Sequence, residues 1–381
     1  MQIRRSDINS ITMRCLENLL PIIDSKTDEI ESGRGLPDDL VAELKSAGVF
    51  RNLIPTKYGG LETSFLEHIG EVQRISQIDA STAWCINQSA VIGTTSLWLE
   101  DDQISEIWGA EDTSVSNGPP FDGAIKPVGS GYLLNGHWGF SSGCQHATWM
   151  CGAARLEDRS GWRLAFFKPT DVEFVDNWQV AGLRGTGSFE FKIKDLQLAN
   201  EWVTDAGLSP TVDIEVTRIP SALLFAVSFA ALALGVAKGG LDDAIEVAEG
   251  KLPRYAPLKL RDDPNVHRFL AKAVASWRSI NSYLHSTVEE VLEQVNNSGP
   301  ATEESRSKLR LCGTHVIREC AEVLDLAYKI VGSTGIYQDH RIQRRFQDMH
   351  VITQHVQARE AHFNLVGKYL ISNEYERGPM S

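Results

Sequence analysis

The chain has 381 residues, of which 42% are hydrophobic and 23% charged, which is the composition of a globular protein. Its formal net charge of −13 argues against nucleic acid or an anionic membrane surface as the main partner. A chain of this length can bury large cores and is expected to contain two or three subdomains.

Neither export nor a membrane span is indicated. No apolar segment follows the first seven residues, so we expect no secretory signal. The longest apolar run, residues 222–237, is interrupted by Ser228 and Gly235 and indicates a buried helix of a bundle. The six cysteines lack paired spacing, which favours a reducing cytoplasm and indicates neither a disulfide framework nor a metal site. We therefore expect a cytoplasmic protein.

The first zone of the chain, residues 1–112, has the periodicity of helices. Pro37 and two acidic residues begin one helix, and Gly48 ends it. A turn cluster at residues 55–60 precedes the next helix, and the small, apolar run 81–91 is typical of a buried helix. This zone predicts an N-terminal helical domain.

The second zone, residues 113–210, consists of short alternating runs between Gly, Asn and Asp turns. Residues 162–167 and 189–193 show the alternation of half-buried strands. We predict a middle β domain, either a small barrel or a sandwich.

The third zone, residues 211–381, is helical again. Short loops separate four long helical patterns, which favours an antiparallel four-helix bundle. The four predicted helices cover residues 219–250, 264–297, 303–332 and 338–373. The whole chain is thus assigned to the α+β class.

Residues 136–149 are the most unusual stretch, because they place aromatic rings and hydroxyls on one strand and the turn after it. Trp138 and Phe140 are followed directly by Ser141 and Ser142. Aromatic faces exclude water and a hydroxyl can hydrogen-bond a ring nitrogen, which are the needs of a flat cofactor. A hairpin with aromatics packed into a core is the alternative.

Helices, then strands, then a helical bundle is an uncommon order, and it resembles the acyl-CoA dehydrogenase fold from about residue 36 to 369. Three segments are similar to landmarks of that family: 55–61 to its N-domain signature, 182–188 to its flavin-side turn, and 331–336 with Arg344 and Asp348 to its C-terminal Gly-rich turn and helix. The resemblance implies that fold for the whole chain.

The catalytic base of the dehydrogenases differs in this chain. Most members of the family carry a Glu followed by Gly shortly after an Arg-Asp pair. Residues 348–357 contain no Glu-Gly; His355 stands there, and Gln347 replaces the usual Arg. In this the chain resembles the oxygenase components of two-component flavin monooxygenases, and residues 136–149 are similar to the same strand of their phenol-hydroxylating members.

This resemblance implies an oxidoreductase that uses reduced flavin (FADH2 or FMNH2) and O2, through a C4a-hydroperoxyflavin, to hydroxylate a phenol, an indole or a related small aromatic. The sequence has no dinucleotide fingerprint and no Walker A loop, as expected of an enzyme that receives its reduced flavin from a separate flavin reductase. The family also implies a homotetramer. We expect no metal, no nucleic acid and no membrane.

The resemblance also implies roles for residues. Ser142 would hydrogen-bond flavin N5, and His355 would be the general base that removes the proton of the substrate. On an alternating strand only one of Ser141 and Ser142 can face the flavin, and the family position favours Ser142. Asp348 lies seven positions before His355, on the same face if the helix is continuous. The other candidate cofactor-binding residues are Trp138, Phe140, Ser141, His146, Thr186, Gly187, Ser188, Arg254 and Gly332.

Several alternatives stay open. His146 is equally consistent with a structural role, Arg254 with a solvated charge, and residues 186–188 with a tight turn. An acyl-CoA dehydrogenase or oxidase with its base elsewhere, for example Glu246, is the first alternative function. An N-oxygenase of an amine is the second, and a non-enzymatic flavin or acyl-CoA binding protein is the third.

Overall fold

The computed structural model describes residues 5–205 and 207–378, and side chains from residue 16 onward. Residues 1–4, on which part of the signal-peptide expectation rests, lie outside it. The chain divides into two compact units. Unit 1 comprises Met1–His68, Trp84–Gln179 and Arg184–Ser221, and unit 2 comprises Ile69–Ala83, Val180–Leu183 and Ala222–Ser381. The predicted domain boundaries at 112/113 and 210/211 both fall inside unit 1.

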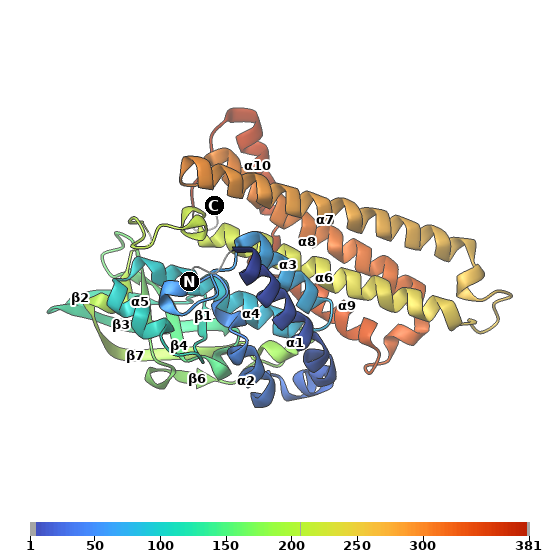
Figure 1. The fold of residues 1–381 in the computed structure, drawn as a ribbon, viewed down its shortest axis with the longest axis horizontal. Helices are drawn as coiled ribbons and strands as arrows, with labels where there is room; N and C mark the ends of the chain where they lie inside the picture. The colour runs from blue at the N-terminus through green and yellow to red at the C-terminus, as the bar shows by residue number, and fades with distance from the viewer. Residues whose placement is uncertain (1–4, 206, 379–381) are drawn as a thin grey trace. The chain divides into compact units, whose positions relative to one another are not determined.

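The helices of unit 1 follow the predicted N-terminal pattern. They are α1 (Arg5–Gly33), α2 (Asp38–Ser46), most of α4 (Ala80–Gly93) and α5 (Asp101–Trp108) (Figure 1). Pro37 is the N-cap of α2, and Asp38 and Asp39 occupy the first turn, where the helix dipole favours negative charge. Gly48, with φ of 74°, follows its end, so this predicted helix is confirmed.

A single sheet forms the other part of unit 1. Its order is β6-β7-β3-β2-β4-β5-β8, with β1 paired to β4 in parallel. The strands are β1 (Val115–Gly118), β2 (Ala124–Val128), β3 (Gly131–Ser141), β4 (Trp149–Leu156), β5 (Trp162–Phe167), β6 (Glu173–Val175), β7 (Phe189–Ala199) and β8 (Val203–Thr204). The predicted β domain is confirmed, and both predicted strands lie in β5 and β7.

Strand β3 is irregular at the point where the candidate residues lie. Its pairing with β7 shifts register between Trp138 and Ser141, and Phe140 has a φ of 57°. A bulge of this kind breaks the alternation of a strand and redirects its side chains. Trp138 is fully buried and Phe140 is 58% exposed, although a regular strand would place both on one face.

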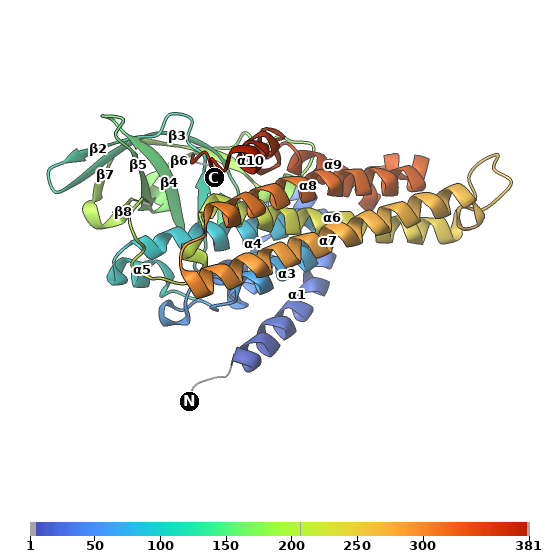
Figure 2. The ribbon, with the colours of Figure 1, turned by 90° about the horizontal axis from the view of Figure 1, so that it is seen from above.

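Unit 2 is built from long helices. They are most of α3 (Phe65–Ser76), α6 (Ser221–Gly250), α7 (Pro264–Ser298), α8 (Glu303–Val331), α9 (Arg341–Ile352) and α10 (Ala361–Ser372). Helices α6, α7 and α8 run side by side in both views (Figures 1 and 2). These three helices, α6, α7 and α8, begin and end within two residues of the positions predicted for the first three bundle helices.

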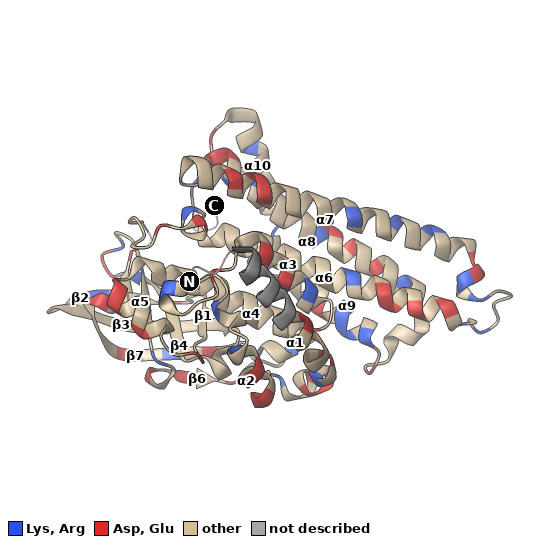
Figure 3. Ribbon diagram, viewed as in Figure 1, with Lys and Arg blue, Asp and Glu red and all other residues tan. Residues whose placement is uncertain are grey.

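Helix α6 is the core helix of this unit. Its first 17 residues, 221–237, carry no charge, and charged residues appear only toward its C-terminal end (Figure 3). By length and composition α6 could cross a membrane, but 83% of its most apolar window is buried inside the structure. Burial of this kind is typical of a core helix in a soluble protein. Gly235 allows α3 to approach closely, because an added Cβ would overlap Gln73 and Ser76.

The prediction of one continuous helix over residues 338–373, the fourth of the bundle, is wrong. The chain forms two helices, α9 and α10, separated by a short 3-10 turn. Side chains of α8 explain the break, since Thr314 Oγ1 donates to the carbonyl of Gln357 (3.1 Å) and Arg318 Nε to that of Ala358 (2.9 Å). These tertiary bonds satisfy carbonyls that a continuous helix would use for its own ladder.

Candidate functional site

The hydroxyl of Ser142 belongs to a buried chain of hydrogen bonds in unit 1. Trp84 Nε1 on α4 donates to Ser142 Oγ at 2.9 Å. Ser142 Oγ lies 2.7 Å from Ser188 Oγ, which lies 2.7 Å from Thr186 Oγ1. None of the four side chains is more than 7% exposed. The structure thus brings together three candidate residues, which we call the hydroxyl chain: Ser142, Ser188 and Thr186.

Two tight turns hold this chain in place. Gly143 follows β3 with a φ of 73°, and its N–H donates to the carbonyl of Thr186 at 2.9 Å. Gly187 precedes β7 with a φ of 50°. Glycine adopts such left-handed conformations without steric cost, so both turns follow from the sequence. Gly187 thus shapes the turn before β7, and its contact with the cofactor stays a prediction.

The two adjacent serines differ in surroundings. Ser141 is fully buried, and its Oγ has no hydrogen-bond partner among the described residues. It lies close to Gly118, where an added Cβ would be 2.6 Å from the hydroxyl. Of the two serines only Ser142 joins the hydroxyl chain, and the choice of Ser142 over Ser141 at the flavin stays a prediction.

The structure does not bring Trp138 into the hydroxyl chain, and its place at the cofactor site stays a prediction. Its ring is fully buried in the core of the sheet and stacks on Phe191, with ring centroids 5.0 Å apart. Its Nε1 donates to the carbonyl of Ala153 at 2.9 Å. Trp138 still pairs in register with Phe191, and the bulge that follows it turns Phe140 outward. Phe140 instead meets Phe121 and Trp178 edge to face, at 6.5 and 6.2 Å.

His146 makes contacts that favour its structural alternative. Its ring packs on Phe50 with centroids 5.2 Å apart, and its carbonyl accepts from Ser114 Oγ at 2.9 Å. Burial lowers the pKa of His146 to about 3. The ring is therefore neutral at neutral pH and acts as a packing element beside the Gly143 turn.

His355, in unit 2, is the N-cap of the 3-10 turn Val356–Ala358. Its Nδ1 accepts from the backbone N–H of Gln357 at 3.4 Å, and its ring meets Phe229 of α6 edge to face at 4.6 Å. Burial, reinforced by the nearby charge of Arg359, lowers the pKa of His355 to about 4. The imidazole is thus neutral at neutral pH, and the Gln357 contact favours the tautomer with its hydrogen on Nε2.

Asp348 does not share a helical face with His355, which corrects the argument from spacing. Helix α9 ends at Ile352, so the two residues lie on different elements. Asp348 is buried, and its Oδ1 accepts from the backbone N–H of Leu183 at 2.6 Å. Its role is to hold the segment before the flavin-side turn. A second histidine, His350 on α9, is exposed and pairs with Asp325 at 3.3 Å.

Arg254 and Gly332 lie on two segments that unit 2 ties together. Lys251 Nζ, in the loop after α6, donates to the carbonyl of Val331 (2.6 Å) and to Thr334 Oγ1 (2.7 Å). Gly332 ends α8 with a φ of 61°. Arg254 is exposed and lies over the ring of the next residue, a tyrosine, at 5.1 Å. An exposed guanidinium is suited to a phosphate ligand.

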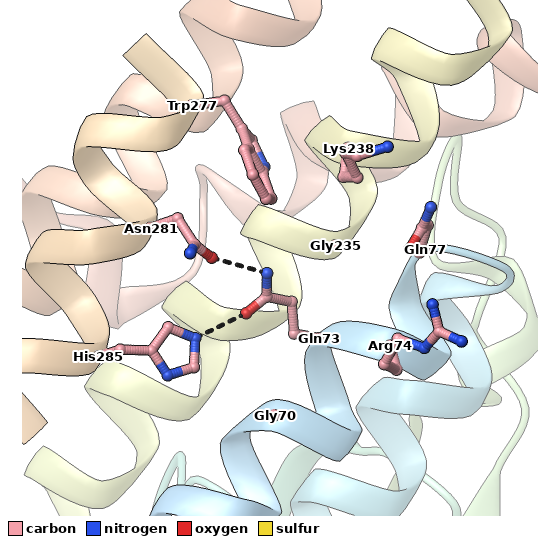
Figure 4. Close-up of a pocket in the computed structure, with 9 residues that line it drawn as sticks. All are labelled: Gly70, Gln73, Arg74, Gln77, Gly235, Lys238, Trp277, Asn281 and His285. Carbon is pink, nitrogen blue, oxygen red and sulfur yellow. Dashed lines mark hydrogen bonds between the residues drawn. The ribbon is translucent and has the colours of Figure 1, made fainter. Parts of the chain in front are cut away.

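A cavity of about 360 Å³ opens between α3, α6 and α7 in unit 2 (Figure 4). The amide of Gln73 occupies it, bonded to Asn281 (2.8 Å) and His285 (3.0 Å). Lys238, which lines the cavity, is nine residues or about two and a half turns from Phe229 on α6. The cavity therefore lies on the face of α6 opposite His355 and is separate from it. None of the sequence-predicted site residues lines it.

Sequence reasoning missed Trp84, which supplies the fixed donor to Ser142. The run 81–91 indicates only a buried helix, and its one indole is the signal that a buried N–H needs an acceptor. Among the described residues, no group of three or more His, Cys, Asp or Glu side chains is placed to hold a metal.

The sequence matches two family models, the acyl-CoA dehydrogenase N-terminal domain at residues 17–103 and the acyl-CoA dehydrogenase C-terminal domain at 227–360. The structure of 3-HSA hydroxylase from Rhodococcus sp. RHA1 superposes with a TM-score of 0.90 at 24% identity, covering 97% of this chain and 98% of that one. Fold and matches together define a protein of the acyl-CoA dehydrogenase class.

Two relatives narrow that class. Indole-3-acetate monooxygenase of Pseudomonas putida is 31% identical over 341 residues, which cover 87% of this chain and 86% of that protein. The oxygenase subunit HsaA of a flavin-dependent monooxygenase from Mycobacterium tuberculosis is 29% identical over 369 residues, or 91% of each chain. The chain belongs to the flavin-dependent monooxygenases of this fold, as an oxygenase component. It uses reduced flavin and O2.

The residues of unit 1 fit a flavin on two counts. A serine hydroxyl can make three hydrogen bonds, and Trp84 and Ser188 account for two of those of Ser142. One position is left for a ligand atom such as a ring nitrogen. The exposed ring of Phe140 adds an aromatic surface two residues away.

Proposed function

We propose that the protein inserts one oxygen atom into a small aromatic substrate, with Ser142 at flavin N5 and His355 handling the proton of the substrate. The relatives are named for aromatic substrates, among them indole-3-acetate, which supports an indole or a phenol as substrate class. The observation that carries the proposal is the Ser142 hydroxyl, held by two partners and with one hydrogen-bonding position left.

Reduced flavin, when bound, supplies the two electrons with which O2 gives one atom to the substrate and one to water. The residues of this chain would orient the flavin and keep bulk water away from it. Ser142 fixes the position of N5, and its burial excludes bulk water from that atom. Phe140, with Trp178 and Phe121 at its edges, offers an apolar surface beside it.

Burial lowers the pKa of His355 to about 4, so the ring is neutral at neutral pH and has a lone pair that can accept a proton. The same shift makes it a weaker base than an exposed imidazole, because a general base works best with a pKa near the working pH. To accept at Nε2 it must carry its hydrogen on Nδ1 and give up the contact from Gln357. Giving up this 3.4 Å contact leaves the buried N–H of Gln357 without an acceptor, so the change of tautomer costs about 1–3 kcal/mol. We propose that His355 takes the phenolic or ring proton of the substrate at Nε2.

Acyl-CoA dehydrogenase chemistry is less well supported, because it requires a carboxylate base. Glu246 is exposed on α6, and Asp348 is committed to the Leu183 N–H. An N-oxygenase remains the second alternative and differs only in its substrate. A separate flavin reductase, a homotetramer and a cytoplasmic location complete the proposal.

Paired variants test the two roles. Each protein is mixed anaerobically with reduced flavin and then with O2, while absorbance and product formation from a panel of phenols, indoles and amines are followed. We expect Ser142→Ala to shorten the lifetime of the near-ultraviolet transient, and His355→Ala to spare that transient but abolish product. His350→Ala, an exposed histidine, is the control. Wild-type product yields from both variants would refute the assignment, and oxidation of amines alone would favour the N-oxygenase.

A further inference from the structure

The partners of Ser142 leave it little freedom. A serine hydroxyl has one hydrogen and two acceptor lone pairs. The indole N–H of Trp84 can only donate, so its 2.9 Å bond permanently occupies one lone pair of Ser142. One lone pair and one hydrogen remain for two partners, which are Ser188 and the ligand. One of these partners must donate to Ser142, and the other must accept from it.

This constraint makes the direction of the hydroxyl chain depend on the flavin, and here the argument rests on the proposed place of Ser142 at N5. N5 of reduced flavin carries a hydrogen and donates, whereas N5 of oxidised flavin carries none and accepts. With reduced flavin, Ser142 accepts from N5 and must give its own hydrogen to Ser188. With oxidised flavin, Ser142 donates to N5 and accepts from Ser188.

We propose that Ser188 is a positioning residue that acts through Ser142 to favour reduced over oxidised flavin. Ser188 can take the hydrogen of Ser142 because Thr186 Oγ1, 2.7 Å away, receives the hydrogen of Ser188 in turn. Ser188 and Thr186 are 3% and 2% exposed, so bulk water cannot replace either partner. In this proposal Ser188 and Thr186 act on the flavin through Ser142.

The effect of removing Ser188 has a definite sign. In Ser188→Ala with reduced flavin, the hydrogen of Ser142 is a buried donor without an acceptor, which weakens binding about tenfold. With oxidised flavin the same variant leaves only a lone pair of Ser142 unfilled, which costs less. Thr186→Val has the same shape as threonine and moves the unpaired hydrogen one step along, to Ser188. Thr186→Val is therefore also expected to weaken the binding of reduced flavin more than that of oxidised flavin. Because Ser188 stays in place, this result cannot come from a cavity left at position 188.

The test is the ratio of two dissociation constants, one for chemically reduced and one for oxidised flavin, measured anaerobically with both FMN and FAD. We expect Ser188→Ala and Thr186→Val to shift this ratio about tenfold toward oxidised flavin. Trp84→Phe removes a bond that both flavin states keep, so we expect it to weaken both and to leave the ratio within about threefold of wild type. Ser188→Thr, which restores a hydroxyl, is expected to restore the ratio.

Ser142→Ala separates this inference from the proposed function. If Ser142→Ala shifts the ratio while Ser188→Ala and Thr186→Val leave it within about threefold of wild type, the inference is overturned and Ser142 keeps its place at N5. If Ser142→Ala itself leaves the ratio unchanged, the place of Ser142 at N5 and the inference both fall.

Discussion

The carboxylate of Asp348 accepts a hydrogen bond from the backbone N–H of Leu183 at 2.6 Å, and both residues are buried. The bond holds the short segment Val180–Leu183 against α9, within unit 2. Gly182 allows the close approach, because an added Cβ would overlap the backbone of Gln347. Asp348, which the sequence spacing placed on one helical face with His355, instead anchors the segment Val180–Leu183.

Removing this anchor is expected to destabilise the protein. Asp348→Ala leaves the buried N–H of Leu183 without an acceptor, which costs about 1–3 kcal/mol of the free energy of unfolding. Urea denaturation measures this loss. Asp348→Asn keeps an acceptor oxygen and should lose less. Asp325→Ala, at an exposed carboxylate, is the control, and an equal loss in Asp325→Ala and Asp348→Ala would contradict the anchoring role.

The crossing of α3 and α6 gives a second prediction. Gly235→Ala places a Cβ against the backbone carbonyl of Gln73, which cannot rotate away, so we expect a loss of about 1–3 kcal/mol in the free energy of unfolding. Gly367→Ala, inside α10, meets nothing within 4 Å and should stabilise by about 0.5–1 kcal/mol through helix propensity. Thermal unfolding of the two variants should therefore move in opposite directions, and a common direction would contradict the packing described.

The pH dependence of stability is expected to report His68. This buried ring bonds Asn87 Oδ1 through Nε2 (3.1 Å) and contacts the side-chain amide of Asn52 through Nδ1 (3.4 Å). Burial lowers the pKa of His68 to about 4, below the ~6.5 of an unfolded histidine. As pH falls from 6.5 to 4 the unfolded chain binds the proton first, so the stabilisation that neutral His68 gives above pH 6.5 is progressively lost.

The size of this effect can be measured by difference. Between pH 7 and pH 5 the linkage at His68 removes about 2 kcal/mol of the free energy of unfolding. His68→Gln should flatten the pH dependence by that amount, as measured by urea denaturation at several pH values. His350→Gln, an exposed histidine, should leave the wild-type slope, and identical slopes for His68→Gln and wild type would exclude a buried neutral His68.

Two aromatic residues of β3 separate flavin binding from stability. Phe140→Ala changes a side chain that is 58% exposed, so we expect several-fold weaker binding of reduced flavin with little change in stability. Trp138→Phe removes a buried ring system and the N–H bond to Ala153, so we expect a loss of about 1–3 kcal/mol in stability and unchanged flavin affinity. The reversed pattern would support Trp138 as a cofactor residue and count against Phe140.

Local signals in the sequence predicted most of the fold. Pro264 at the start of α7 and Gly299 directly after it fix that helix within one residue of its predicted range. The break before α10 has no such signal, because its cause is the pair of bonds from Thr314 and Arg318 of α8. A tertiary contact of this kind is invisible to periodicity.

The sequence also predicted part of the candidate site. The family position singled out Ser142, Thr186 and Ser188, and the structure brings their three hydroxyls together. The bulge in β3 places Phe140 on the other side of the strand from Trp138, and an alternating sequence pattern cannot reveal a bulge. Trp84, 58 residues before Ser142, could be joined to it only by the fold.

Rapid mixing of the protein, loaded anaerobically with reduced flavin, with O2 tests the central claim most directly. The account predicts an absorbance transient in the near ultraviolet, distinct from reduced and oxidised flavin, that lasts for seconds or longer before the yellow flavin returns. Immediate return of the yellow flavin, at the rate of free reduced flavin in buffer, would contradict it.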